Sequence, residues 1–122
     1  MNKKCLIIDD VEVSRYVISE AVQGLGFQPQ EAEQEAQAMQ LLRKEHFDVI
    51  FLDWHLRKQD GLALIPEIRA ISGAQNTPIV VCTGVEMDKD LNDIKNSGAQ
   101  GFLKKPTDPA TVKAELVRLS LI

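Results

Sequence analysis

Five short apolar runs alternate with segments of helical periodicity, and this alternation limits the fold of the 122-residue chain more than any other feature. Continuous apolar runs of about four residues are typical of strands whose two faces are both covered, as in a parallel sheet. The runs occupy residues 5–8, 49–52, 79–82 and 101–103, with a weaker one near Phe27. Strand and helix alternating in this way predict a parallel sheet with helices on both faces, joined by right-handed crossovers.

Between the runs, apolar residues recur three or four positions apart, which places them on one face of a helix. In the first helix the expected inward face is formed by Val13, Val17, Ala21 and Leu25, and it is widened by Ile18 and Val22. We therefore expect one three-layer α/β domain over residues 1–122.

Proline and aspartate mark several element boundaries. Asp108 and Pro109 are expected to be the N-cap and the first residue of the fifth helix. Pro66 lies about one turn into the third helix, which is expected to begin late or to bend there. Pro29 favours an edge position for the second strand, because proline cannot donate a hydrogen bond to a neighbouring strand.

Composition excludes two classes of partner. Acidic residues outnumber basic ones by 18 to 14, a net charge of −4, whereas a general nucleic-acid binder needs a basic face. No apolar run approaches the roughly 18–20 residues of a membrane span, and no signal peptide precedes the first strand. Cys5 and Cys82 lie inside apolar runs without the spacing of metal ligands, so they are expected to be buried thiols in a cytoplasmic, reducing compartment.

Polar side chains follow four of the expected strands at their carboxyl ends. In an open parallel sheet these ends meet at one edge, where ligands bind. The edge is expected to gather acidic, hydroxyl and basic groups from Asp9, Asp10, Asp53, Thr83, Lys104 and Lys105.

The three aspartates predict a divalent cation. Crowded carboxylates repel one another unless a cation lies among them, and a site made only of oxygen ligands suits Mg²⁺. A metal ion, a lysine and a hydroxyl are also what a transferring phosphoryl group needs, so Asp53 is a candidate nucleophile. A dinucleotide or flavin site is excluded, because the loop after the first strand reads Asp9-Asp10-Val11-Glu12 in place of glycines or hydroxyls.

Five short motifs, taken in their order along the chain, carry a family resemblance. They are Asp9-Asp10, Asp53-Trp54, Asp60-Gly61, Thr83-Gly84 and Lys105-Pro106. With them, essentially the whole chain resembles the receiver domain of two-component response regulators, and among these the stand-alone CheY-like proteins. The resemblance implies a (βα)5 flavodoxin-like fold with strand order 2-1-3-4-5 and a single receiver domain over residues 1–122. In that order the strands of Cys5 and Cys82 flank the third strand, about 10 Å apart, which is too far for a disulfide.

The resemblance also implies a role for each acidic residue. Asp53 would accept a phosphoryl group from a phosphohistidine. Asp10 and Asp53 would bind Mg²⁺ directly, with the backbone carbonyl of His55 as a third ligand and Asp9 acting mainly through water. The ring of His55 would then face solvent.

The remaining motif residues would contact the phosphoryl group or transmit its presence. Lys105 would pair with a phosphoryl oxygen, and Lys104 would be a surface neighbour. The hydroxyl of Thr83 would move onto the phosphoryl group, and Gly84 would leave room for it. Phe102 occupies a switch position that is often aromatic.

The sequence departs from the common receiver pattern at three places. Leu56-Arg57 stands where many receivers have methionine and proline, which replaces a rigid residue by a cation. Phe102 lacks the hydroxyl of the tyrosine found in other receivers. Thr107 stands where an apolar aromatic residue commonly follows the proline.

The function implied is a phosphorylation switch and not an enzyme, beyond self-phosphorylation and self-dephosphorylation of Asp53. Its partners would be a sensor histidine kinase or a histidine phosphotransfer protein, and a downstream protein bound by the face of the fourth helix, fifth strand and fifth helix. The resemblance fits a chemotaxis-type switch that is a monomer or weak dimer. A phosphorelay shuttle or phosphate sink is an alternative. Two further hypotheses remain: a phosphate-independent interaction module with this fold, and a small Mg²⁺-dependent phosphohydrolase. The phosphohydrolase hypothesis is weakened because such enzymes usually have a second acid two residues beyond the nucleophile, where this chain has His55.

Overall fold

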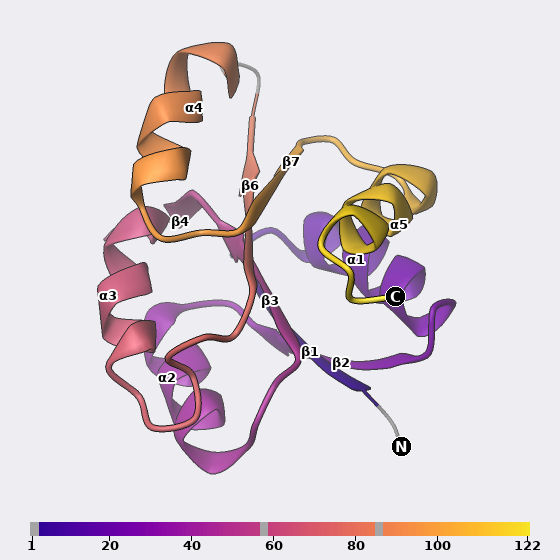
Figure 1. Ribbon diagram of the computed structural model, residues 1–122. Helices are drawn as coiled ribbons and strands as arrows, with labels where there is room; N and C mark the ends of the chain where they lie inside the picture. The colour runs from indigo at the N-terminus through magenta and orange to yellow at the C-terminus, as the bar shows by residue number, and fades with distance from the viewer. Residues whose placement is uncertain (1–2, 57–58, 85–86) are drawn as a thin grey trace.

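A parallel sheet with helices on both faces forms the protein in the computed structural model, which describes residues 3–56, 59–84 and 87–122 (Figure 1). The strands of this sheet are β1 (Lys3–Ile8), β2 (Phe27–Ala32), β3 (Val49–Asp53), β6 (Ile79–Thr83) and β7 (Gly101–Lys104). They pair in the order β2-β1-β3-β6-β7, and every pair is parallel. Both the fold class and the expected strand order 2-1-3-4-5 are confirmed.

The helices divide into two layers. They are α1 (Glu12–Gln23), α2 (Glu35–Lys44), α3 (Leu64–Arg69), α4 (Met87–Asn96) and α5 (Pro109–Arg118). Helices α1 and α5 lie on one side of the sheet, and α2, α3 and α4 lie on the other (Figure 1). Alternate residues of β1 point to the two sides: Leu6 and Ile8 join the hydrophobic cluster that contains the α2 and α3 side chains, and Cys5 and Ile7 join the cluster that contains those of α1 and α5.

The expected inward face of α1 was wrong in part. Ile18, Ala21 and Val22 are buried as expected, but Val13 is 67% exposed, and the polar residues Arg15 and Ser19 are buried on this face. The true face begins at Arg15, whose charge hides the periodicity of that face in the sequence. Apolar spacing alone places Val13 on this face and cannot reveal that Arg15 and Ser19 belong to it.

The boundary residues lie as predicted. Asp108 Oδ1 accepts a hydrogen bond from the Thr111 N–H at 2.8 Å, and Pro109 begins α5. Pro29 lies on β2, which pairs only with β1 within the described sheet. Helix α3 begins late, because a 3-10 turn, η1 (Gly61–Ala63), precedes it and leaves Pro66 in its first turn.

A small hairpin that the sequence did not predict follows β3. It pairs β4 (His55–Leu56) with β5 (Gln59–Asp60) in antiparallel fashion, and Arg57 lies outside the described residues. The chain then returns to β3 at Gly61, whose N–H donates to the Trp54 carbonyl at 2.5 Å. A β-carbon at position 61 would overlap the Asp53 carbonyl oxygen, so the Asp60-Gly61 motif has a steric cause at the end of β3.

Both cysteines are free and buried, as expected. Burial raises the pKa of Cys82 to about 12, so its thiol stays protonated. Within the described residues, no helix has both the length and the apolar character needed to cross a bilayer.

Candidate functional site

Three carboxylates meet at the carboxyl edge of the sheet. Asp9 and Asp10 follow β1, and Asp53 ends the adjacent strand β3. One carboxylate oxygen from each lies within 4.8 Å of the others. Asp9 and Asp53 are 2% and 5% exposed, and Asp10 is half-buried. The sheet therefore brings together the three acidic residues that the sequence singled out.

Backbone contacts fix the direction of the Asp9 side chain. Its N–H donates to the Ala32 carbonyl at 3.0 Å, and its Oδ1 accepts from the Val11 N–H at 2.9 Å. Its carbonyl oxygen accepts from Arg15 Nη1 at 2.8 Å. Asp9 is thus held by the neighbouring strand, by its own turn and by helix α1.

Lys105 supplies the positive charge of the site. Its Nζ lies 2.6 Å from Asp9 Oδ2 and 3.3 Å from Asp53 Oδ1. Its backbone N–H donates to the Thr83 carbonyl at 2.6 Å, which ties the end of β7 to the end of β6. Burial lowers the pKa of Lys105, but the ion pairs with Asp9 and Asp53 outweigh this and leave the pKa above its ordinary value.

The Asp53 carboxyl resists ionisation. Burial is the largest cause and the neighbouring Asp9 carboxylate adds to it, so the pKa of Asp53 rises to about 6 despite the attraction of Lys105. The His55 N–H also donates to Asp53 Oδ1, at 3.3 Å. Asp9 and Asp53 share the Lys105 ammonium, so an added cation would favour the ionised form of Asp53.

Thr83 and Gly84 stand at the end of the next strand. Thr83 is 2% exposed, and the residue before it, Cys82, is aligned with Asp53 in the β3–β6 register. Apart from its neighbours in the chain, no described residue has an atom within 4 Å of the position that a β-carbon on Gly84 would occupy. There is open space beside this glycine among the described residues.

Phe102 and His55 lie around this edge. Phe102 is half-buried and packs against the cluster that contains the α2 and α3 side chains, and its N–H donates to Glu115 Oε2 at 2.8 Å. The ring of His55 is exposed and stacks on the Trp54 indole, with centroids 5.5 Å apart. Lys104 is exposed, as expected.

A divalent cation fits the donor set of this site. Three carboxylates offer hard oxygen ligands, which suit Mg²⁺ better than a transition metal. Sequence reasoning did not find the contacts of Arg15 with Asp9 or of Glu115 with Phe102. Both depend on long side chains that reach across from another element, for which no local pattern exists.

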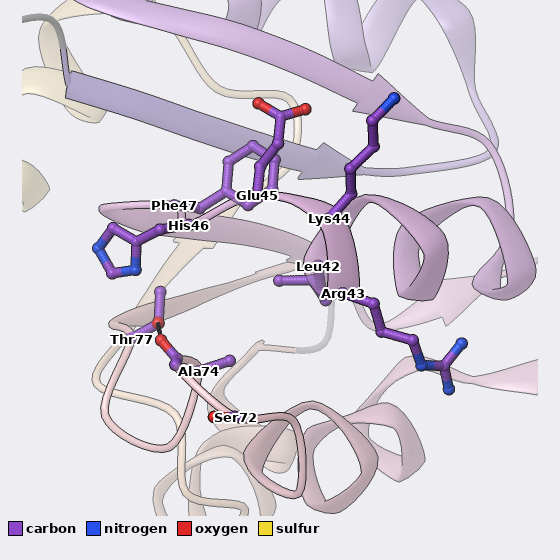
Figure 2. A pocket seen from close by; sticks show the side chains of 10 residues that line it. Leu42, Arg43, Lys44, Glu45, His46, Phe47, Ser72, Ala74 and Thr77 are labelled. Carbon is purple, nitrogen blue, oxygen red and sulfur yellow. Dashed lines mark hydrogen bonds between the residues drawn. The ribbon is translucent and has the colours of Figure 1, made fainter.

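The opposite edge of the sheet holds a pocket without comparable chemistry. Its volume is about 130 Å³, and it lies between the segment after α2 and the loop after α3 (Figure 2). His46 is 68% exposed there and lies 3.8 Å from Asp48. Arg43 and Lys44 point in different directions, so no cluster of like groups converges on this pocket (Figure 2).

Comparison with known proteins identifies the family of the chain. The family model described as "Response regulator receiver domain" matches residues 5–117. The chain belongs to this family. Chemotaxis protein CheY-3 of Vibrio cholerae is 29% identical over 119 residues, covering 97% of this receiver and 92% of that protein.

Two further relatives show the range of the family. The phosphate regulon transcriptional regulatory protein PhoB of Escherichia coli is 29% identical, and the match spans 98% of this receiver but 54% of PhoB. The solved structure of the chemotaxis response regulator CheY4 of Vibrio cholerae superposes with a TM-score of 0.89 at 28% identity, covering 98% of this receiver and 99% of CheY4.

Proposed function

We propose that this receiver is a phosphorylation switch whose acceptor is Asp53. The observation that carries the proposal is the position of its carboxylate: at a strand end, beside the Lys105 ammonium and within reach of two further carboxylates. The donor is a phosphohistidine of a sensor histidine kinase or a histidine phosphotransfer protein. An Asp53 oxygen attacks phosphorus, the phosphorus–nitrogen bond breaks, and the imidazole leaves and takes up a proton.

Mg²⁺ is the proposed cofactor, held by Asp10, Asp53 and the backbone carbonyl of His55. Asp9 acts mainly through water, which is consistent with both of its carboxylate oxygens being engaged already, by the Val11 N–H and by Lys105. When bound, the ion supplies positive charge against the phosphoryl oxygens. Lys105, which follows β7, supplies a second positive charge, with its Nζ 3.3 Å from Asp53 Oδ1.

Phosphorylation changes the charge at the edge of the sheet. The group adds about −1.5 to −2 charges and three acceptor oxygens. Lys105 can pair with these oxygens, and the Thr83 hydroxyl can donate to one of them beside the open space at Gly84. The resulting loop arrangement is read by a partner on the face of α4, β7 and α5, with Phe102 as the half-buried contact between site and face.

The donor protein must cover the first turn of α1 to reach Asp53. Val13 and Tyr16 are exposed there, by 67% and 60%. Val13 also lines an apolar groove of about 150 Å³, whose other walls include Pro106, Thr107 and Lys105. This surface offers apolar contact next to the acceptor carboxylate, as a protein phosphodonor requires.

Intact-mass measurement tests the proposal. The protein is incubated with Mg²⁺ and a small acyl phosphate, and wild type should gain the mass of one phosphoryl group. Asp53→Asn should gain none, whereas Asp93→Asn, on the exposed part of α4, should behave as wild type. Folded wild-type protein that takes up no phosphoryl group would refute the proposal.

Partner binding separates the switch from a phosphate-independent module with the same fold. A switch binds its downstream protein more tightly when phosphorylated, and equal affinity for both forms would favour the module. The named relatives include chemotaxis proteins and a transcriptional regulator. Proteins captured from host lysate by the phosphorylated form but not by the Asp53→Asn variant would therefore identify the downstream partner. We propose that turnover of the phosphoryl group on Asp53 is the extent of its enzymatic activity. We also propose a cytoplasmic location.

A further inference from the structure

Arg15 is a charged side chain buried within the α1 layer. Only 7% of the residue is exposed, although arginine is rarely buried unless it is paired. Its Nε lies 3.0 Å from Glu31 Oε1, and its Nη2 lies 3.5 Å from Glu33 Oε1. The remaining nitrogen, Nη1, donates to the Asp9 carbonyl at 2.8 Å. One guanidinium thus links α1, the end of β1 and the end of β2.

Core stability alone does not account for an arginine at this place. Replacing a buried ion pair with apolar side chains of similar volume is often neutral or stabilising. The helix has apolar neighbours on the same face, Ile18 and Val22, so an apolar residue at position 15 would continue that face. What an apolar residue would not supply is a donor to the Asp9 carbonyl.

The carbonyl that Arg15 binds belongs to the peptide between the two acidic residues. Asp9 is 2% exposed, so its carbonyl would lose its hydrogen bond within the protein if the guanidinium were removed. A buried carbonyl without a partner is costly, and the peptide would turn toward water. Turning this peptide would move the starting point of the Asp10 side chain as well as that of Asp9.

We propose that Arg15 is a positioning residue for the divalent-ion site. It sets the plane of the Asp9–Asp10 peptide and so the approach of both carboxylates to Asp53. Its charge is paired with Glu31 and Glu33, so its effect on the site comes from the direction in which its Nη1–H group holds the Asp9 carbonyl. The inference rests on the proposed Mg²⁺ site, and it adds a residue that contacts neither the ion nor the phosphoryl group.

Metal affinity tests this role separately from stability. Mg²⁺ is titrated into metal-free protein, followed by the fluorescence of Trp54 and by calorimetry, for Arg15→Met, Arg15→Lys and the exposed-site control Arg43→Met. Arg15→Met should bind Mg²⁺ about tenfold more weakly, the effect usual for residues that orient metal ligands. Arg15→Lys should show a smaller, several-fold loss, because one ammonium cannot bond in two directions as the guanidinium fork does. Arg43→Met should match wild type.

Urea unfolding of the same variants in chelator measures the structural cost of each change. A purely structural Arg15 would lower the unfolding free energy and leave the Mg²⁺ dissociation constant of the folded protein unchanged. That result in Arg15→Met with a wild-type circular dichroism spectrum overturns the inference. If Arg15→Met does not fold, Arg15→Lys decides, and an unchanged dissociation constant there overturns it.

The outcomes also separate this inference from the proposed function. Wild type that binds Mg²⁺ but accepts no phosphoryl group refutes the switch and leaves the Arg15 comparison valid. Wild type that is phosphorylated while the Arg15 variants bind Mg²⁺ normally refutes only the role of Arg15. Wild type that binds no Mg²⁺ refutes both.

Discussion

Removing the charge of Asp53 should stabilise the metal-free protein. The residue is 5% exposed, and its pKa is raised from 3.8 to about 6, so the folded state binds its proton more tightly than the unfolded state does. Between these two values the folded state carries more protons, and stability falls as the pH rises. Above them the penalty is complete and amounts to about 3 kcal/mol. Asp53→Asn keeps the shape and removes that penalty.

Urea unfolding in chelator, at two pH values, measures the effect. At about pH 7 the Asp53→Asn variant should be more stable than wild type by up to about 3 kcal/mol, and near pH 4.5 the gain should shrink to roughly 1 kcal/mol. Asp93→Asn, at an exposed site, should change little at either pH. Mg²⁺ should raise the stability of wild type more than that of Asp53→Asn. An Asp53→Asn variant less stable than wild type, or a gain in stability that does not depend on pH, would show that burial and Asp9 do not destabilise the ionised form of Asp53.

Three other substitutions probe features that hold the site in place. Gly61→Ala should cost about 2 kcal/mol in urea unfolding, because its methyl group would overlap the Asp53 carbonyl oxygen, whereas Gly84→Ala, with open space around it, should cost little. Arg69→Met should cost about 2 kcal/mol by the same measurement, since the guanidinium donates to the carbonyls of residues 74, 77 and 98. An unchanged unfolding free energy in either Gly61→Ala or Arg69→Met would contradict its assigned contacts. Asp108→Ala should lower the thermal midpoint at neutral pH by removing the cap of α5, and the difference should fade below about pH 4, since the hydrogen bond to the Thr111 N–H lowers the pKa of Asp108. A difference that persists in acid would argue against the cap.

The sheet was predictable because its strands are apolar on both faces. Residues such as Ile50 and Val80, which are fully buried, leave little choice of environment, so the five runs and their helices follow from composition and spacing. The same rule predicted Ile18, Ala21 and Val22 on the inward face of α1 but could not predict Arg15 and Ser19, which are polar. A charge enters a core only with partners, and those partners lie on β2 and the loop after it, distant in sequence.

The candidate site was predictable in its members but not in its contacts. Strand ends of a parallel sheet lie together, so Asp9, Asp10 and Asp53 had to meet. That Lys105 would lie closer to Asp9 than to Asp53 depends on side-chain reach, which no motif encodes. The β4–β5 hairpin was missed because strands of two residues leave no periodic signal in the sequence.

The division of the core by the sheet has a thermodynamic consequence. Leu6 and Ile8 contribute to one hydrophobic cluster, and Cys5 and Ile7 contribute to the other. Side chains on opposite sides do not share a packing environment, so substitutions in the two layers should have additive effects on stability. A partner that binds over α1 and a rearrangement on the α4 side therefore disturb different clusters. Energetic coupling between the two layers is therefore expected at the strand ends, where Asp53, Thr83 and Lys105 lie.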